Sequence, residues 1–93
     1  MRKVRVVYFY SDKPGPSRVQ NLLMKELESQ FKKRVEFKRI EVKKNEEAAK
    51  IYRVDDVPTI VIECNGKEKE RFRGLTQELF LRRAIEKVLK ECK

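Results

Sequence analysis

The sequence lacks histidine and tryptophan, and it contains only two cysteines, Cys64 and Cys92, among 93 residues. A structural zinc site usually takes four cysteine or histidine ligands, and a serine or cysteine nucleophile usually needs a histidine base. Neither arrangement can be assembled from these residues. We therefore expect no metal ion, no cofactor and no hydrolytic chemistry of the Ser-His or Cys-His kind.

Long hydrophobic runs are also missing. The apolar stretch near the N-terminus is interrupted by Arg5 and ends at Ser11, whereas a membrane helix needs about 20 apolar residues. We expect neither a signal peptide nor a membrane association, and hence a cytoplasmic location.

Charge is abundant instead. Charged residues make up 42% of the chain, the formal net charge is +9, and 40% of the residues are hydrophobic, which is enough for one core. We expect a single domain over residues 1–93. Only three Asn and three Gln accompany the many Lys, Glu and Arg residues, a bias typical of a heat-adapted source.

Apolar runs of strand and helix type alternate along the chain. Residues 4–10 are β-branched or aromatic with one charge, and Asn65-Gly66 is a strong signal for a type I′ hairpin. The recurrence of apolar residues three or four positions apart predicts a helix that buries one stripe of side chains: Val19, Leu22, Leu23, Leu27 and Phe31. The predicted strands are 4–10, 35–42, 60–64 and 67–73, and the predicted helices are 16–33, 45–52 and about 76 onward.

The resulting order is β-α-β-α-β-β-α, an α/β fold. A right-handed crossover places the first two strands in parallel, and the hairpin adds an antiparallel pair whose charged last strand belongs at an edge. The predicted sheet is four-stranded and mixed, in the order second, first, third, fourth. We expect the first and last helices on one face and the short middle helix on the other.

The stretch Phe9 to Arg18 (FYSDKPGPSR) resembles the F-W-A-x-W-C-G-P-C-K motif of the thioredoxin and glutaredoxin superfamily, and Val57-Pro58-Thr59 resembles its I-P-T. The resemblance covers nearly the whole chain and implies the thioredoxin-like fold. The chain departs from the motif at both family cysteines, which fall on Pro14 and Ser17, and the family's buried acid falls on Tyr8. Neither Pro14 nor Ser17 can supply the thiolate or the resolving thiol of disulfide exchange.

The resemblance also implies a peptide-binding groove beside a cis proline, Pro58. An extended partner segment pairs with the exposed backbone there in the family, although the proline can equally serve only to preserve a turn. The positions that would form this groove are Lys13, Gly15, Pro16, Arg18, Val57, Pro58, Arg73 and Gly74. Ser17 is expected to be a residue of the helix cap or first turn.

The two remaining cysteines fall far from the motif. Cys64 ends the third predicted strand and Cys92 ends the last helix, which should run back to the same hairpin end. A structural Cys64–Cys92 disulfide, two buried thiols and a redox-active pair are the three alternatives.

The positive charge suggests nucleic acid as a partner. The basic residues, however, are scattered over several predicted elements with acidic residues between them, which is typical of solvated faces. Lys13, Arg18, Arg53 and Arg73 are the exception, because the resemblance gathers them around the groove, where they would favour an acidic peptide, a phosphate group or nucleic acid.

The sequence therefore predicts a thioredoxin-like protein without the dithiol site, which binds a protein or peptide partner at the Pro58 groove and is not an enzyme. One alternative is a thiol-disulfide oxidoreductase or redox-responsive protein that uses Cys64 and Cys92. A second alternative is a basic domain that binds nucleic acid. The sequence does not indicate the oligomeric state.

Overall fold

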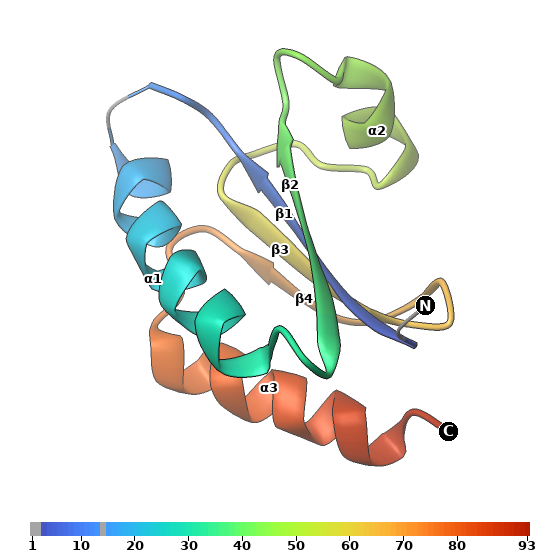
Figure 1. The fold of residues 1–93 in the computed structure, drawn as a ribbon. Coiled ribbons are helices and arrows are strands. Elements are labelled where there is room, and N and C mark those ends of the chain that lie inside the picture. The colour runs from blue at the N-terminus through green and yellow to red at the C-terminus, as the bar shows by residue number, and fades with distance from the viewer. Residues whose placement is uncertain (1–2, 14) are drawn as a thin grey trace.

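The computed structural model describes residues 3–13 and 15–93, and they form a four-stranded sheet with three helices (Figure 1). The elements are β1 (Val4–Tyr10), α1 (Pro16–Phe31), β2 (Val35–Glu41), α2 (Glu46–Ile51), β3 (Thr59–Cys64), β4 (Lys67–Arg73) and α3 (Glu78–Glu91). The strands lie side by side in the order β2-β1-β3-β4, as predicted.

The sheet is mixed, because β1 pairs in parallel with β2 and antiparallel with β3, and β3 pairs antiparallel with β4. The β3–β4 hairpin turns at Asn65 and Gly66, whose φ angles of 52° and 81° are both positive, as a type I′ turn requires. A register shift between Ile62 and Glu63 marks a bulge close to this turn.

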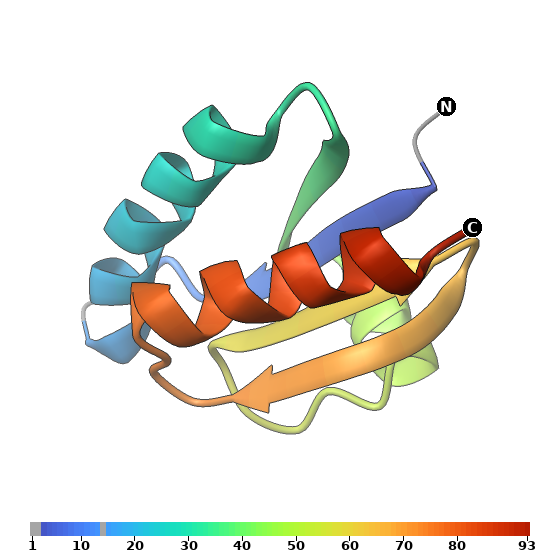
Figure 2. The same cartoon turned by 90° about the horizontal axis from the view of Figure 1, so that it is seen from below.

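Helices cover both faces of the sheet. Helices α1 and α3 lie on one face and α2 lies on the other, as predicted (Figures 1 and 2). Side chains alternate along β1, so that Val6 and Tyr8 face the larger core under α1 and α3 while Val7 and Phe9 face the smaller core under α2. The short α2 begins at its predicted cap, because the Asn45 side chain accepts a hydrogen bond of 3.2 Å from the backbone of Ala48.

The predicted buried stripe of α1 is wrong in its first half. Val19 and Leu22 are 51% and 67% exposed, whereas Gln20 and Met24 are buried, and only from Leu27 onward does the apolar stripe face the core. The spacing of apolar residues identifies a helix but does not fix its rotation about its own axis. Polar contacts of α1 with β1 and with the segment before α3, described below, fix that rotation.

Several helix and strand ends differ from the predictions by one or two residues, as ends usually do. In particular, α1 ends at Phe31 rather than near Lys33, and α3 begins at Glu78 rather than near Thr76. Within residues 3–13 and 15–93, no helix combines the length and the apolarity that crossing a bilayer requires.

Candidate binding site around Pro58

The loop after β1 leads into the first turn of α1. Gly15 is the N-cap residue, with a φ of 133°, and its carbonyl accepts a hydrogen bond of 3.0 Å from the backbone of Arg18. Ser17 lies in the first turn, is only 4% exposed, and accepts a hydrogen bond of 3.3 Å from the backbone of Ser11. Its hydroxyl therefore ties the loop to the helix. Pro14, at the first family cysteine position, lies outside the described residues.

Tyr8 fixes the start of α1 from inside the core. Its hydroxyl donates to Oδ1 of Asn21 at 2.6 Å and also lies 3.1 Å from the carbonyl oxygen of Ser17, and the residue is 1% exposed. Burial raises the pKa of the Tyr8 phenol. A neutral hydrogen-bond donor thus occupies the position where the family resemblance implies an acid.

The segment before β3 meets the end of β4. The Val57–Pro58 peptide bond is cis, and the carbonyl of Pro58 accepts a hydrogen bond of 2.8 Å from the backbone of Gly74. Gly74 has a φ of 82°, which favours glycine over other residues. The strand pairing also places Arg73 opposite Thr59, so the Val57-Pro58 and Arg73-Gly74 segments lie side by side.

Gln20 joins α1 to the segment that follows Gly74, a link that the sequence did not reveal. Its side-chain amide donates to the carbonyl of Thr76 at 3.0 Å and accepts from the Thr76 backbone amide at 2.7 Å. Gln20 is fully buried. In the sequence, Gln20 differs from its neighbours only as an uncharged polar residue beside the apolar stripe of the helix. Many exposed helix positions look the same, so this feature does not predict a buried contact.

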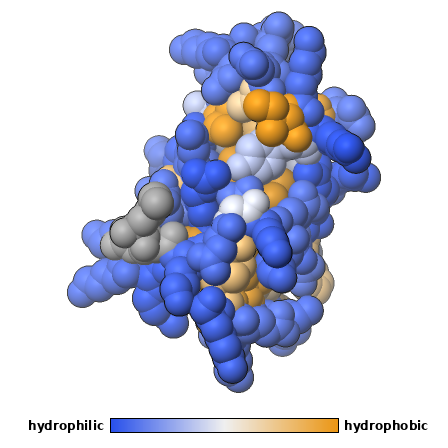
Figure 3. Space-filling model, turned by 90° about the vertical axis from the view of Figure 1, so that its right-hand side faces the viewer, coloured by the Kyte–Doolittle hydropathy of each residue, from blue (hydrophilic) through white to orange (hydrophobic). Residues whose placement is uncertain are grey.

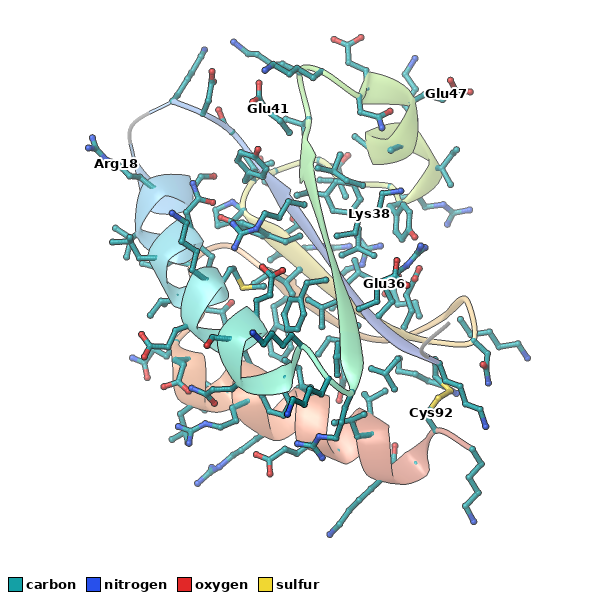
Figure 4. All side chains as sticks on the ribbon, viewed as in Figure 1. Arg18, Glu36, Lys38, Glu41, Glu47 and Cys92 are labelled. Carbon is teal, nitrogen blue, oxygen red and sulfur yellow. A yellow bond between two sulfur atoms is a disulfide. The ribbon has the colours of Figure 1, made fainter. Side chains whose placement is uncertain are left out.

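These contacts bring the N-terminus of α1, the Val57-Pro58 segment and the Arg73-Gly74 segment to one end of the molecule. Arg18 lies at the start of α1 and points away from the sheet (Figure 4). The Lys13 side chain approaches that of Lys43, which lowers the pKa of Lys13.

Arg53 does not join these residues as the sequence had suggested. The Arg53 carbonyl accepts a hydrogen bond of 3.4 Å from Arg71, and Arg53 lines a cleft with Tyr52, Glu63 and Glu68 on the α2 face of the sheet. Residue 53 has a φ of 56°, which turns the chain after α2 toward β4.

Cys64 and Cys92 form a disulfide bond, so the alternative of two free buried thiols is wrong. Cys64 is the last residue of β3, whereas Pro58 precedes the first residue of that strand. The disulfide therefore lies at the opposite end of the sheet from Pro58, and Figure 4 shows Cys92 far from Arg18. This separation leaves the Pro58 end without sulfur chemistry from either cysteine.

Exposed apolar side chains gather at the Pro58 end. Among the described residues, six large hydrophobic side chains are exposed, and five of them lie on the first half of α1 or between Gly74 and the second turn of α3. The N-terminal ends of α1 and α3 lie side by side (Figure 2), and the Gln20–Thr76 hydrogen bonds join them. We call these five residues the apolar patch: Val19, Leu22, Leu75, Leu79 and Phe80.

The arrangement defines an α/β domain of the thioredoxin-like class. The thioredoxin family model matches residues 1–87, and the chain therefore belongs to the thioredoxin family. It is similar to thioredoxin from Fasciola hepatica, with 36% identity over 91% of this chain and 80% of that one and a TM-score of 0.83. It is also similar to an N21Q mutant thioredoxin from Halobacterium salinarum NRC-1, with 30% identity over 92% and 74% of the two chains and a TM-score of 0.85. Among curated proteins, none matches the chain.

Proposed function

We propose that this thioredoxin-family chain binds a segment of a partner protein at the surface around Pro58 and Gly74, and performs no dithiol exchange there. Proline and serine occupy the two positions of the family cysteines, Pro14 and Ser17. The sulfur atoms of the chain's two cysteines are joined to each other at the far end of the sheet. Disulfide exchange needs an accessible thiolate, and this surface has no residue that can supply one.

The apolar patch carries the proposal. In a chain of which 42% is charged, five large exposed hydrophobic side chains at one end leave much apolar surface in contact with water. Large exposed hydrophobic side chains that gather in one region usually mark an interaction site. Leu75 directly follows Gly74, so the patch begins where the backbone segments beside Pro58 end. A partner segment at these backbones can bury its apolar side chains against the patch.

The binding proposal is tested by selecting random peptides on the immobilised protein and measuring their affinity for two variants by fluorescence polarisation. Leu75→Glu should weaken the selected peptides at least about tenfold, because a charge would be buried in the apolar contact. Ile51→Glu is the matched control, since Ile51 is also exposed but lies on α2, and it should change affinity less than about twofold. Equal effects of both substitutions, or no selected peptide, would contradict the proposal.

A separate turnover assay tests whether the protein catalyses dithiol–disulfide exchange. With dithiothreitol as the reductant, insulin should be reduced no faster than in a control without the protein. Faster reduction that is lost in a Cys64→Ser/Cys92→Ser variant would show instead that the disulfide pair takes part in exchange.

The observed disulfide favours a second candidate function, a redox-responsive protein. In this function an external dithiol reduces the Cys64–Cys92 bond, so that both sulfurs become thiols while the dithiol is oxidised to a disulfide. Cys64 is 8% exposed and Cys92 is half-buried at the end of α3, so access by a reductant is through Cys92. Titration of the thiol content against a series of dithiol buffers would measure whether the bond is reduced in the range of cellular dithiols.

A further inference from the structure

The fold gathers basic residues at the end of the sheet opposite Pro58, although they are scattered in the sequence. The first residues of β1 and β2, Val4 and Val35, are paired, and Val4 also pairs with Cys64, the last residue of β3. The segments that flank these residues therefore lie at the same end. We call their exposed basic side chains, with one from the end of α3, the basic pole: Lys3, Lys32, Lys33, Arg34, Lys67 and Lys90.

Backbone contacts and the disulfide hold this end together. The carbonyl of Lys3 accepts a hydrogen bond of 2.9 Å from the backbone of Asn65 in the hairpin. Lys67 pairs with Cys64 at the start of β4. The Cys64–Cys92 bond ties the end of α3, and with it Lys90, to the same hairpin. The backbone positions of the basic pole are therefore fixed relative to one another before any ligand binds.

The charges of the basic pole are not neutralised within the part of the chain that the structure describes. Six ion pairs occur there, and none includes a residue of the pole. Arg34 lies over the ring of Phe31, 5.4 Å from its centroid, and remains exposed to solvent. Glu63, also near this end, is buried in an ion pair of 3.0 Å with Arg5, and Glu68 is paired with Arg71. The acidic neighbours without an ion pair among the described residues are Glu36, Glu86 and Glu91.

Polarity distinguishes this end from the Pro58 end. The exposed large hydrophobic side chains of the described residues lie on α1, α2, α3 or the segment before α3, and none belongs to the pole or to the hairpin. Figure 3 views the side that carries the hairpin and the C-terminus, where hydrophilic side chains surround a broken band of hydrophobic ones in the middle. Protein interfaces need an apolar core and membrane-bound surfaces need apolar anchors, whereas nucleic-acid interfaces are polar and strongly positive.

We propose that the basic pole binds the phosphodiester backbone of nucleic acid without reading its sequence. Lysine ammonium groups donate to phosphate oxygens and displace condensed counterions, which gives affinity that falls steeply with salt. At this end the described residues present neither an exposed aromatic platform nor a helix that could enter a groove of the duplex, so base contacts are not expected. This inference is independent of the proposed partner binding at Pro58, because the two surfaces lie at opposite ends of the sheet.

The test measures binding of a fluorescein-labelled DNA duplex of mixed sequence by polarisation over a series of NaCl concentrations. The pole variant is Lys33→Glu/Lys67→Glu/Lys90→Glu. The control variant is Lys25→Glu/Lys38→Glu/Lys50→Glu, three exposed lysines away from the pole that also lack ion pairs among the described residues. Both variants change the net charge equally, so a difference between them reports position alone.

The pole variant should weaken binding at least about thirtyfold at low salt and reduce the slope of log Kd against log [NaCl] by about 2.7, since each lost phosphate contact contributes about 0.9. The control variant should weaken binding less than about threefold. Thermal melts of all three proteins check that they are folded.

Equal losses in both variants would overturn the proposal, because net charge alone would then explain the binding. Absence of binding at low salt would also overturn it. Tighter binding of poly-glutamate, or of vesicles that contain phosphatidylserine, than of the duplex at the same salt would assign the pole to an acidic protein or a membrane surface instead.

Discussion

Replacing Gln20 by alanine tests whether one buried amide holds the two halves of the Pro58 site together. Gln20 is fully buried and makes two hydrogen bonds to the backbone of Thr76, at 2.7 and 3.0 Å. Thr76 follows the Gly74-Leu75 segment, whose backbone meets Pro58. The substitution removes the side-chain amide but leaves the Thr76 amide and carbonyl groups in place.

The expected decrease in the free energy of unfolding follows from the backbone groups of Thr76 that lose their hydrogen-bond partner. A hydrogen bond contributes about 0.5–1.5 kcal/mol net, and a buried polar group that loses its partner costs about 1–3 kcal/mol. Thr76 is half-buried, so water can reach part of its backbone. We expect the free energy of unfolding to fall by about 2–4 kcal/mol. For a domain of this size, that loss lowers Tm by about 10–20 °C.

The measurement combines thermal unfolding with amide hydrogen exchange at Thr76. Exchange at this amide should accelerate in Gln20→Ala more than exchange in β1, because the contact between α1 and the segment before α3 opens locally. Gln30→Ala is the matched control, since Gln30 is exposed on the same helix, and its Tm should stay within about 3 °C of the native value.

A Tm change in Gln20→Ala as small as that of the control would refute the role of the amide. Unchanged exchange at Thr76 despite a lower Tm would show instead that Gln20 stabilises the core in general and does not position the Gly74–Thr76 segment.

Two further predictions concern the disulfide and Tyr8. Reduction of the disulfide should add two hydrogen atoms to the intact mass. It should also lower the free energy of unfolding by about 3.5 kcal/mol in the chain-entropy model, given the sequence separation of 28 residues. An unchanged denaturation midpoint after complete reduction would contradict this expectation. Burial raises the pKa of the Tyr8 phenol in the folded state. The protonated phenol therefore contributes its full stabilisation below the pKa of the unfolded chain, about 10, and this contribution is lost as the pH rises above that value. Tyr8→Phe should cost about 1 kcal/mol at neutral pH, through the lost hydrogen bonds, and should make the alkaline decline in Tm shallower; an equally steep decline in the variant would assign it to other groups.

Much of the fold could be predicted from local signals. Three local signals identify strands and a hairpin: the β-branched run 4–10, the Asn65-Gly66 turn and the charged strand after it. The order of these elements is compatible with only a few topologies. The sheet order and the placement of the three helices agree with the prediction. The motif that resembles the thioredoxin family also identified Pro58 and the absence of cysteine at positions 14 and 17, since these features depend only on residue identity and spacing.

The tertiary structure alone decided how the helices are rotated and which distant residues meet. Apolar spacing predicted that Val19 and Leu22 face the core, yet the hydrogen bonds of Tyr8 and Gln20 turn them outward and create the apolar patch. Lysines that the sequence scatters among glutamates become one basic pole, because strand pairing brings residues 3, 34 and 67 to the same end. Local preferences act over a few residues, whereas the Gln20–Thr76 contact and the pairing of β1 with β2 and β3 join positions more than thirty residues apart. Only the packed chain determines such contacts.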